Sequence, residues 1–104
     1  MSITTVLVTN SVSNAYVSGG NTAITSLVIN NYTANTITAN VYAVPAGATA
    51  NSQNLILTNL EMTGYETYQL YGAAEKILLG NNDSIQAVAN SDSHLNIVTS
   101  YTTV

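Results

Sequence analysis

Apolar and polar residues alternate with a period of two along much of the chain. The clearest stretch is residues 37–44 (ITANVYAV), in which Ile37, Ala39, Val41 and Ala43 fall on one side. Successive side chains of a β-strand point to opposite faces, so this pattern predicts a strand that is covered on one face. β-branched residues and tyrosines, which favour strands, supply much of such stretches.

The same pattern predicts nine short strands along the whole sequence. Gly, Asn and Pro interrupt the apolar stretches about every 8–12 residues, and these residue types favour turns. The predicted strands are 4–9, 15–18, 22–29, 37–44, 54–57, 66–70, 76–79, 84–89 and 95–101. The predicted breaks are 19–21, 30–31, 34–35, 45–47, 64, 72 and 80–83. We expect an all-β fold, a single antiparallel β-sandwich of jelly-roll type.

The length of the chain favours one domain that spans residues 1–104. A chain of 104 residues buries about two-thirds of its surface on folding, which is enough for one hydrophobic core. No composition shift marks a linker, and no apolar run reaches the roughly 18 residues of a membrane span. The first residues lack the positive charge of a signal peptide, so we expect synthesis in a cytoplasm and no membrane partner.

Charge is scarce. Lys76 is the only basic residue, and the net charge is −4. The five acidic residues are Glu61, Glu66, Glu75, Asp83 and Asp92. Nucleic-acid binding requires several basic residues along a phosphate backbone, so the composition excludes it as a partner class. The absence of Cys removes disulfides, thiolate metal sites and cysteine nucleophiles.

Candidate catalytic and metal-ligating residues are few. His94 is the only histidine, and we expect it in a hairpin loop between residues 89 and 95. A zinc site needs three or four converging ligands, which one His and no Cys do not provide. Asn81, Asn82 and Asp83 follow Gly80 and predict a turn in preference to a calcium loop. We therefore assign no catalytic, cofactor-binding or metal-binding residue.

Hydrolysis by paired carboxylates is the enzymatic alternative. Glu61, Glu66 and Glu75 are the candidates, and such chemistry requires two carboxyl groups about 5–10 Å apart. All three lie at or near predicted strand ends, where acidic residues more often keep a surface soluble. The prediction is that the protein is not an enzyme.

Tyr65, Tyr68 and Tyr71 form the most informative cluster in the sequence. Exposed tyrosines stack on sugars or anchor protein interfaces. In a chain without Phe or Trp, tyrosines also fill the core and its rim, and both interpretations stay open. Alternation places Tyr65 and Tyr71 on one strand face and Tyr68 on the other, so at least one should be exposed or at an interface. We take these three as candidate interface residues.

The polar residues that replace charges suggest a surface for association. Asn, Thr and Ser occupy 39 of the 104 positions. Such groups pair with another protein without the desolvation cost of buried charges. Low charge also favours association at neutral pH, so we expect an assembly subunit.

The order of the strand blocks resembles that of small structural proteins of tailed bacteriophages, the roughly 100-residue type found in cyanophages and marine phages. The blocks that carry the resemblance are residues 24–30, 41–47, 54–57, 66–68, 76–80, 83–89 and 98–101. Two departures are Asn81 and Asn82, inserted after Gly80, and Tyr65, which stands where a turn residue is usual. Neither departure should disturb a sandwich.

The resemblance implies a non-enzymatic virion component without cofactors. The resemblance points to capsid decoration (cement) proteins that stabilise the phage head. The alternative that it leaves open is a neck, tail or fibre-associated module, with or without contact to glycans. It implies the major capsid protein or other virion proteins as partners, a homo-oligomer (trimer or dimer), and location in the virion after synthesis in the host cytoplasm.

Overall fold

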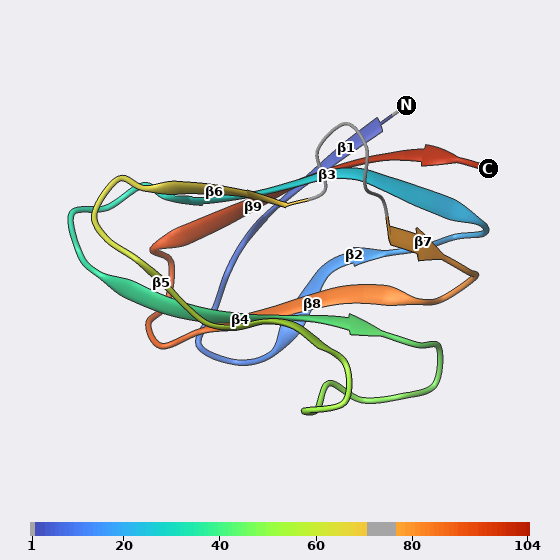
Figure 1. Ribbon diagram of the computed structural model, residues 1–104, viewed down its shortest axis with the longest axis horizontal. Coiled ribbons are helices and arrows are strands. Elements are labelled where there is room, and N and C mark those ends of the chain that lie inside the picture. Colours follow the sequence, from blue (N-terminus) through green and yellow to red (C-terminus); the bar gives the residue numbers. More distant parts are fainter. Residues whose placement is uncertain (1, 71–76) are drawn as a thin grey trace.

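All regular elements in the computed structural model are β-strands; the structure describes residues 2–70 and 77–104. The strands are β1 (Ser2–Leu7), β2 (Ser13–Val17), β3 (Thr22–Asn31), β4 (Ile37–Val44), β5 (Leu55–Met62), β6 (Thr67–Leu70), β7 (Ile77–Leu79), β8 (Ser84–Ala89) and β9 (Leu95–Thr103). Sheet I has the order β1-β9-β3-β6, with β7 also paired to β3, and sheet II has the order β2-β8-β4-β5 (Figure 1). The described residues contain no helix of the length and apolar character needed to cross a membrane.

The first half of the chain pairs antiparallel with the second half. β1 pairs with β9, β2 with β8, β3 with β6 and β7, and β4 with β5. The chain is thus one long hairpin, with its tip in the loop at 45–54, and the hairpin is rolled so that its strands fall into two facing sheets (Figure 1). This arrangement is the jelly roll, and it confirms the fold class predicted from the sequence.

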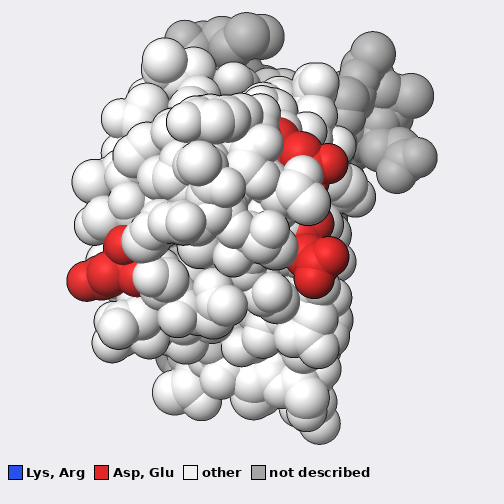
Figure 2. Space-filling model, turned by 90° about the vertical axis from the view of Figure 1, so that its left-hand side faces the viewer, with Lys and Arg blue, Asp and Glu red and all other residues white. Residues whose placement is uncertain are grey.

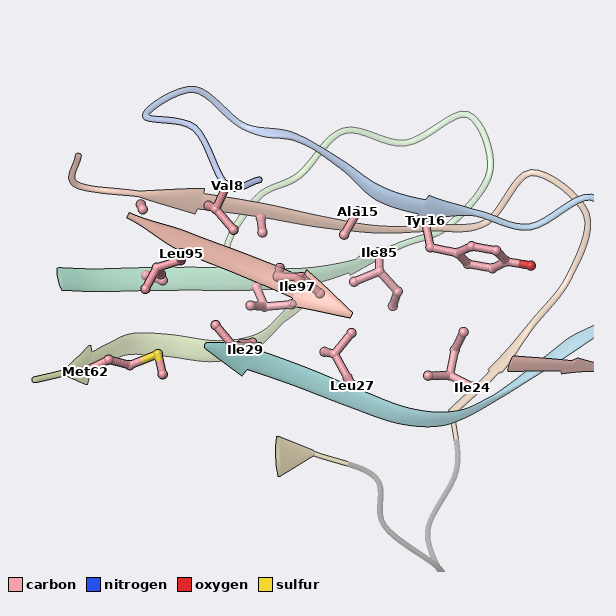
Figure 3. Packing of buried hydrophobic residues seen from close by; sticks show 14 of the residues in the cluster. Val8, Ala15, Tyr16, Ile24, Leu27, Ile29, Met62, Ile85, Leu95 and Ile97 are labelled. Carbon is pink, nitrogen blue, oxygen red and sulfur yellow. The ribbon is translucent and has the colours of Figure 1, made fainter. Parts of the chain in front are cut away.

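The core lies between the two sheets and is built from aliphatic side chains of both. Ile24, Leu27 and Ile97 of sheet I and Ile85 of sheet II are almost fully buried there (Figure 3). Each such side chain stabilises the fold by about 1.5–3 kcal/mol through removal from water. The predicted inner face of residues 37–44 is confirmed, because its first three apolar residues are buried and Ala43 packs against the core.

Two tyrosines fill the core and its rim, as one interpretation of the sequence predicts. Tyr16 is buried at one end of the sandwich, and its ring centroid lies 4.5 Å from that of Tyr101. The Tyr16 hydroxyl donates to Thr22 Oγ1 at 3.4 Å. These rings close the core in a chain that has no Phe or Trp.

Most predicted strand bounds agree with the structure to within one or two residues, and β4 and β8 agree fully. β5 is the exception, because it continues to Met62 where the prediction ends at residue 57. Asn59 has φ 50° and marks a bulge, so the polar residues there interrupt the sequence pattern without ending the strand. The predicted break at 30–31 is wrong, since β3 runs through Asn31.

The predicted hairpin around His94 is also wrong. Residues 90–94 join β8 of sheet II to β9 of sheet I, so the loop arches between the sheets. Sequence alternation identifies both flanking strands but carries no information about which sheet each one joins. The predicted break at residue 72 lies outside the described residues.

Candidate functional site

Charged residues are almost absent from the strands. The described strands of sheet I contain none, and those of sheet II contain only Glu61. Glu66, Asp83 and Asp92 all lie in turns or loops. The sandwich therefore offers broad uncharged faces, and its described acidic groups are concentrated at the ends of strands.

One row of residues on the outer face of sheet I is joined by amide and hydroxyl hydrogen bonds. Asn30 Nδ2 donates to Asn96 Oδ1 at 3.1 Å, and Thr67 Oγ1 donates to Asn30 Oδ1 at 2.9 Å. These residues occupy one row across β9, β3 and β6. These hydrogen bonds hold the side chains of the row in fixed positions, so a contact over them would cost little further side-chain entropy.

One end of the sandwich, which we call the loop end, comprises residues 32–36, 63–66 and 90–94; it is on the left in Figure 1. The fully buried Asn31 organises it. Its Nδ2 donates to Asn35 O (2.6 Å), Thr63 O (3.1 Å) and Met62 O (3.2 Å), and its Oδ1 accepts from the N–H and hydroxyl of Thr33. One amide side chain therefore fixes the β3–β4 loop against the β5–β6 turn.

The β5–β6 turn is closed by hydrogen bonds between its own residues and packs closely against the β3–β4 loop. Thr63 N–H donates to Glu66 Oε1 at 2.6 Å, and Glu66 N–H donates back to Thr63 O at 3.1 Å. A Cβ at Gly64 would lie 2.6 Å from the backbone oxygen of Ala34, so only glycine fits this approach. Tyr65 N–H then donates to the carbonyl of Thr33 at 3.0 Å.

Tyr65 is the most exposed of the candidate interface residues that the structure describes. Its side chain is 71% exposed, and its φ of 64° places it in the left-handed region. A non-glycine residue in that region costs about 1–2 kcal/mol, which the surrounding hydrogen bonds must offset. A bulky, exposed side chain held at such a cost is typical of residues that make contacts.

The other two candidates differ from Tyr65. Tyr68 lies on β6 opposite Ile29, on the inner side of this edge strand, and is 36% exposed. Tyr65 lies in the turn before β6, so the argument from alternating strand faces does not apply to it. Tyr71 is outside the described residues. The structure therefore does not place the three tyrosines on one surface.

Tyr32 is an exposed aromatic residue that sequence reasoning missed. It lies at the loop end, where its hydroxyl donates to Ser93 O and its N–H donates to His94 O. Both bonds hold it beside the β8–β9 loop. Tyr32 directly precedes Thr33, whose carbonyl accepts the N–H of Tyr65. The sequence shows Tyr32 as part of an Asn-Tyr-Thr turn and gives no sign of its exposure.

Asp83 and Asp92 also fix backbone segments, as Glu66 does in the β5–β6 turn. Asp83 accepts the N–H of Ala46 at its Oδ1 and that of Gly80 at its Oδ2, both at 2.8 Å. Asp92 Oδ1 accepts the N–H of Asn10 at 3.0 Å. Figure 2 shows the loop end, where acidic groups lie apart near the margins and uncharged atoms fill the surface between them.

The hydrolase alternative and the calcium turn gain no support from this geometry. Glu66 is engaged in closing its turn, and Glu75 lies outside the described residues. Both oxygens of Asp83 accept backbone hydrogen bonds. Within residues 2–70 and 77–104, no group of three or more His, Asp or Glu residues is placed to hold a metal ion.

Three hollows on the described surface are open to solvent. One of about 170 Å³ lies between the end of β4 and β7, one of about 220 Å³ lies beside Asn40 and Asn59, and one of about 290 Å³ lies beside Tyr16 and Tyr101. Pockets for small molecules usually hold roughly 300–1,000 Å³. The flat faces and the loop end are therefore the better candidates for contact.

Comparison of the chain with protein-family models, with curated proteins and with solved structures gives no match in any of the three.

Proposed function

We propose that this protein is a non-enzymatic virion structural protein, a capsid decoration protein that stabilises a phage head. The observation that carries the proposal is the uncharged outer face of sheet I, with its hydrogen-bonded row of Asn96, Asn30 and Thr67. A static protein contact over such a face buries no charge, so its desolvation cost is low. The partner is the major capsid protein or another virion protein, and the place of action is the virion.

The jelly-roll architecture is consistent with this role, because it recurs in viral capsid domains. Fold alone does not imply function, so the proposal rests on the surface. The described strands of sheet I present a broad face without charge, which suits a subunit that covers a junction between other proteins. The resemblance of the strand blocks to phage structural proteins points in the same direction.

A reconstitution experiment tests the role in the virion. Purified protein is added to phage particles that lack it, and bound copies are counted by quantitative mass spectrometry. Hundreds of copies support head decoration, whereas about six or twelve indicate a symmetric ring at the neck or tail. No binding to particles, and no chain in native virions, would overturn the virion role.

A pair of lysine variants identifies the surface. Ser100→Lys places a charge on β9 in the middle of the outer face of sheet I, and Thr49→Lys places the same charge in the exposed loop at 45–54. We expect Ser100→Lys to lower particle binding at least tenfold and Thr49→Lys to leave it unchanged. Equal binding by both variants would show that another surface docks.

The exposure of Tyr65 favours a second candidate, a tail or fibre-associated module that contacts glycans. Its ring projects from the loop end on a backbone held in the left-handed region. Glycan-array binding that is lost in Tyr65→Gly and kept in Tyr65→Phe would support this role, because only the second variant retains a stacking ring. A silent array for the unaltered protein would count against it.

A further inference from the structure

The two sheets leave edge strands whose backbone groups lack a partner on one side. β1 forms one edge of sheet I, and β6 and β7, which both pair with β3, form the other; β2 and β5 are the edges of sheet II. Exposed edges pair readily with other strands, so proteins protect them with bulges, charges, proline or short length. The four edges here differ in this protection.

Three of the edges are protected. β2 has a register shift between Asn14 and Tyr16. β5 has a bulge at Asn59, with its positive φ, and carries the charged Glu61. On the edge formed by β6 and β7, β6 has only four residues and directly follows Glu66, and β7 has only three residues. A second strand would meet a distorted backbone, a charge or a very short template at each of them.

β1 has none of these protective features. Its six residues pair with β9 in an unbroken register from Ser2 to Leu7, without charge, glycine or proline. On its outer face, Ile3 is 64% exposed and Leu7 is 52% exposed. An edge that is regular, uncharged and apolar is a template for strand addition.

The hydrogen-bonding direction of each β1 residue follows from Val8. Its N–H donates to Leu95 O at 2.9 Å, so Val8 faces β9. Backbone groups of successive strand residues alternate in direction, so Ile3, Thr5 and Leu7 direct their N–H and C=O groups away from β9. Within the described part of the chain, no turn, loop or side-chain hydrogen bond reaches these backbone groups.

We infer that β1 pairs antiparallel with β1 of a second copy of this chain, about a two-fold axis at Thr5. In this register Thr5 lies opposite the partner's Thr5, and Ile3 lies opposite the partner's Leu7. The backbone N–H and C=O groups of all three residues point away from β9, so each opposed pair exchanges two N–H···O bonds. The pairing joins the two copies of sheet I into one continuous sheet.

A second copy suits this edge because the edge is complementary to itself. The pairing places aliphatic side chains opposite each other on the outer face and Thr opposite Thr at the axis, both of which are favourable cross-strand pairs. A two-fold contact requires such a self-complementary patch. The chain carries a net charge of −4, and two copies approach with least repulsion along a strand that carries no charge.

Single-cysteine variants test the register, since the natural chain has no cysteine. Residues opposed in a hydrogen-bonded pair have Cα atoms about 5.5 Å apart, within disulfide range, so Thr5→Cys should form a covalent dimer on mild oxidation. In the same pairing the two copies of residue 3 lie roughly 13 Å apart, so Ile3→Cys should not. Thr67→Cys on β6 measures cross-linking by random collision, and we expect Thr5→Cys to react at least tenfold faster.

Proline variants test the backbone contact without a covalent bond. Thr5→Pro removes an N–H that points away from β9, so the β1–β9 ladder remains, whereas Thr5→Val keeps that N–H. In sedimentation velocity at micromolar to millimolar concentration, the unaltered protein and Thr5→Val should dimerise. Thr5→Pro should dissociate at least tenfold more readily, with an unchanged circular dichroism spectrum.

A pair of introduced charges gives a third test, which depends on neither the cysteine variants nor Thr5→Pro. Ile3→Lys should weaken the dimer, and the double variant Ile3→Lys, Leu7→Glu should restore it, because each lysine then faces the partner's introduced glutamate. A monomeric protein at millimolar concentration, or a Thr5→Cys rate equal to that of Thr67→Cys, would overturn the inference. So would a dimer that Thr5→Pro leaves intact. The dimer is measured with purified protein alone, so its failure is distinct from failure of the virion role.

Discussion

The two ends of β3 differ in how they satisfy the hydrogen bonds of a buried polar side chain. Asn31 at one end and Thr22 at the other are both buried polar residues. At the loop end, five hydrogen bonds converge on the single side-chain amide of Asn31. At the other end, Thr22 shares hydroxyl bonds with Ser18 and Tyr16, and Asp83 fixes the nearby turn separately. Stabilisation is concentrated at the loop end and distributed at the other, so single substitutions should affect the two ends unequally.

Asn31→Asp should have the largest effect. The new carboxylate cannot donate a hydrogen bond, and it would face three carbonyl oxygens in a buried site. We expect a loss of about 3–5 kcal/mol in the free energy of unfolding, measured by urea denaturation. Asn30→Asp, one residue earlier on the outer face, is the control and should cost about 1 kcal/mol or less. Equal losses would show that Asn31 does not organise the loop end.

Gly64→Ala should come next, because its Cβ would lie 2.6 Å from Ala34 O, a backbone atom. We expect a loss of about 2–3 kcal/mol, which in a domain of this size lowers Tm by about 4–8 °C per kcal/mol. Gly19→Ala, near the opposite end, has no atom within 4 Å of the added methyl group and should change stability by less than about 0.5 kcal/mol. An unchanged stability of Gly64→Ala would mean that the β3–β4 loop and the β5–β6 turn can move apart without cost.

Asp83→Ala tests the distributed end. It removes the acceptor for two backbone N–H groups, those of Ala46 and Gly80, and should cost about 1–2 kcal/mol in thermal or urea denaturation. Asp92→Ala removes the acceptor for one N–H, that of Asn10, and should cost about half as much. If Asp83→Ala were as damaging as Asn31→Asp, the contrast between the two ends would fail.

Tyr65→Gly should have the smallest effect and the opposite sign. Glycine adopts a φ of 64° without steric cost, so we expect a gain of about 0.5–1 kcal/mol in the free energy of unfolding. Tyr65→Phe should leave stability unchanged and serves as the control. A gain in stability together with a loss of binding to particles or glycans would identify Tyr65 as a contact residue kept at the expense of stability.

The strands were predictable because side-chain alternation is local. Residues 37–44 and 84–89 show their pattern without reference to the rest of the chain, and both strands have the predicted bounds. The errors arise where pairing with a strand distant in the sequence determines how far a strand extends. Asn59 interrupts the pattern of β5, yet pairing with β4 on both sides of the bulge keeps the strand intact.

The candidate site was only partly predictable for the same reason. Tyr65 is evident as an aromatic residue in a sequence cluster, and its exposure agrees with the expectation that at least one of the three tyrosines is exposed. Asn31 looks like a turn residue in the sequence and proves to be a buried hydrogen-bonding centre. Its role depends on Met62 and Thr63, which approach it only after β5 has paired with β4.

The rolled hairpin also determines when the protein can fold during synthesis. The strand that completes sheet I beside β1 is β9, which leaves the ribosome after all the other strands. Pairing between such distant segments gives a high contact order and slow folding. Until β9 emerges, β1 has no partner on either side, so the nascent chain exposes an apolar segment that chaperones can bind. Slow translation over residues 90–103 should therefore prolong the period in which the chain is prone to aggregation.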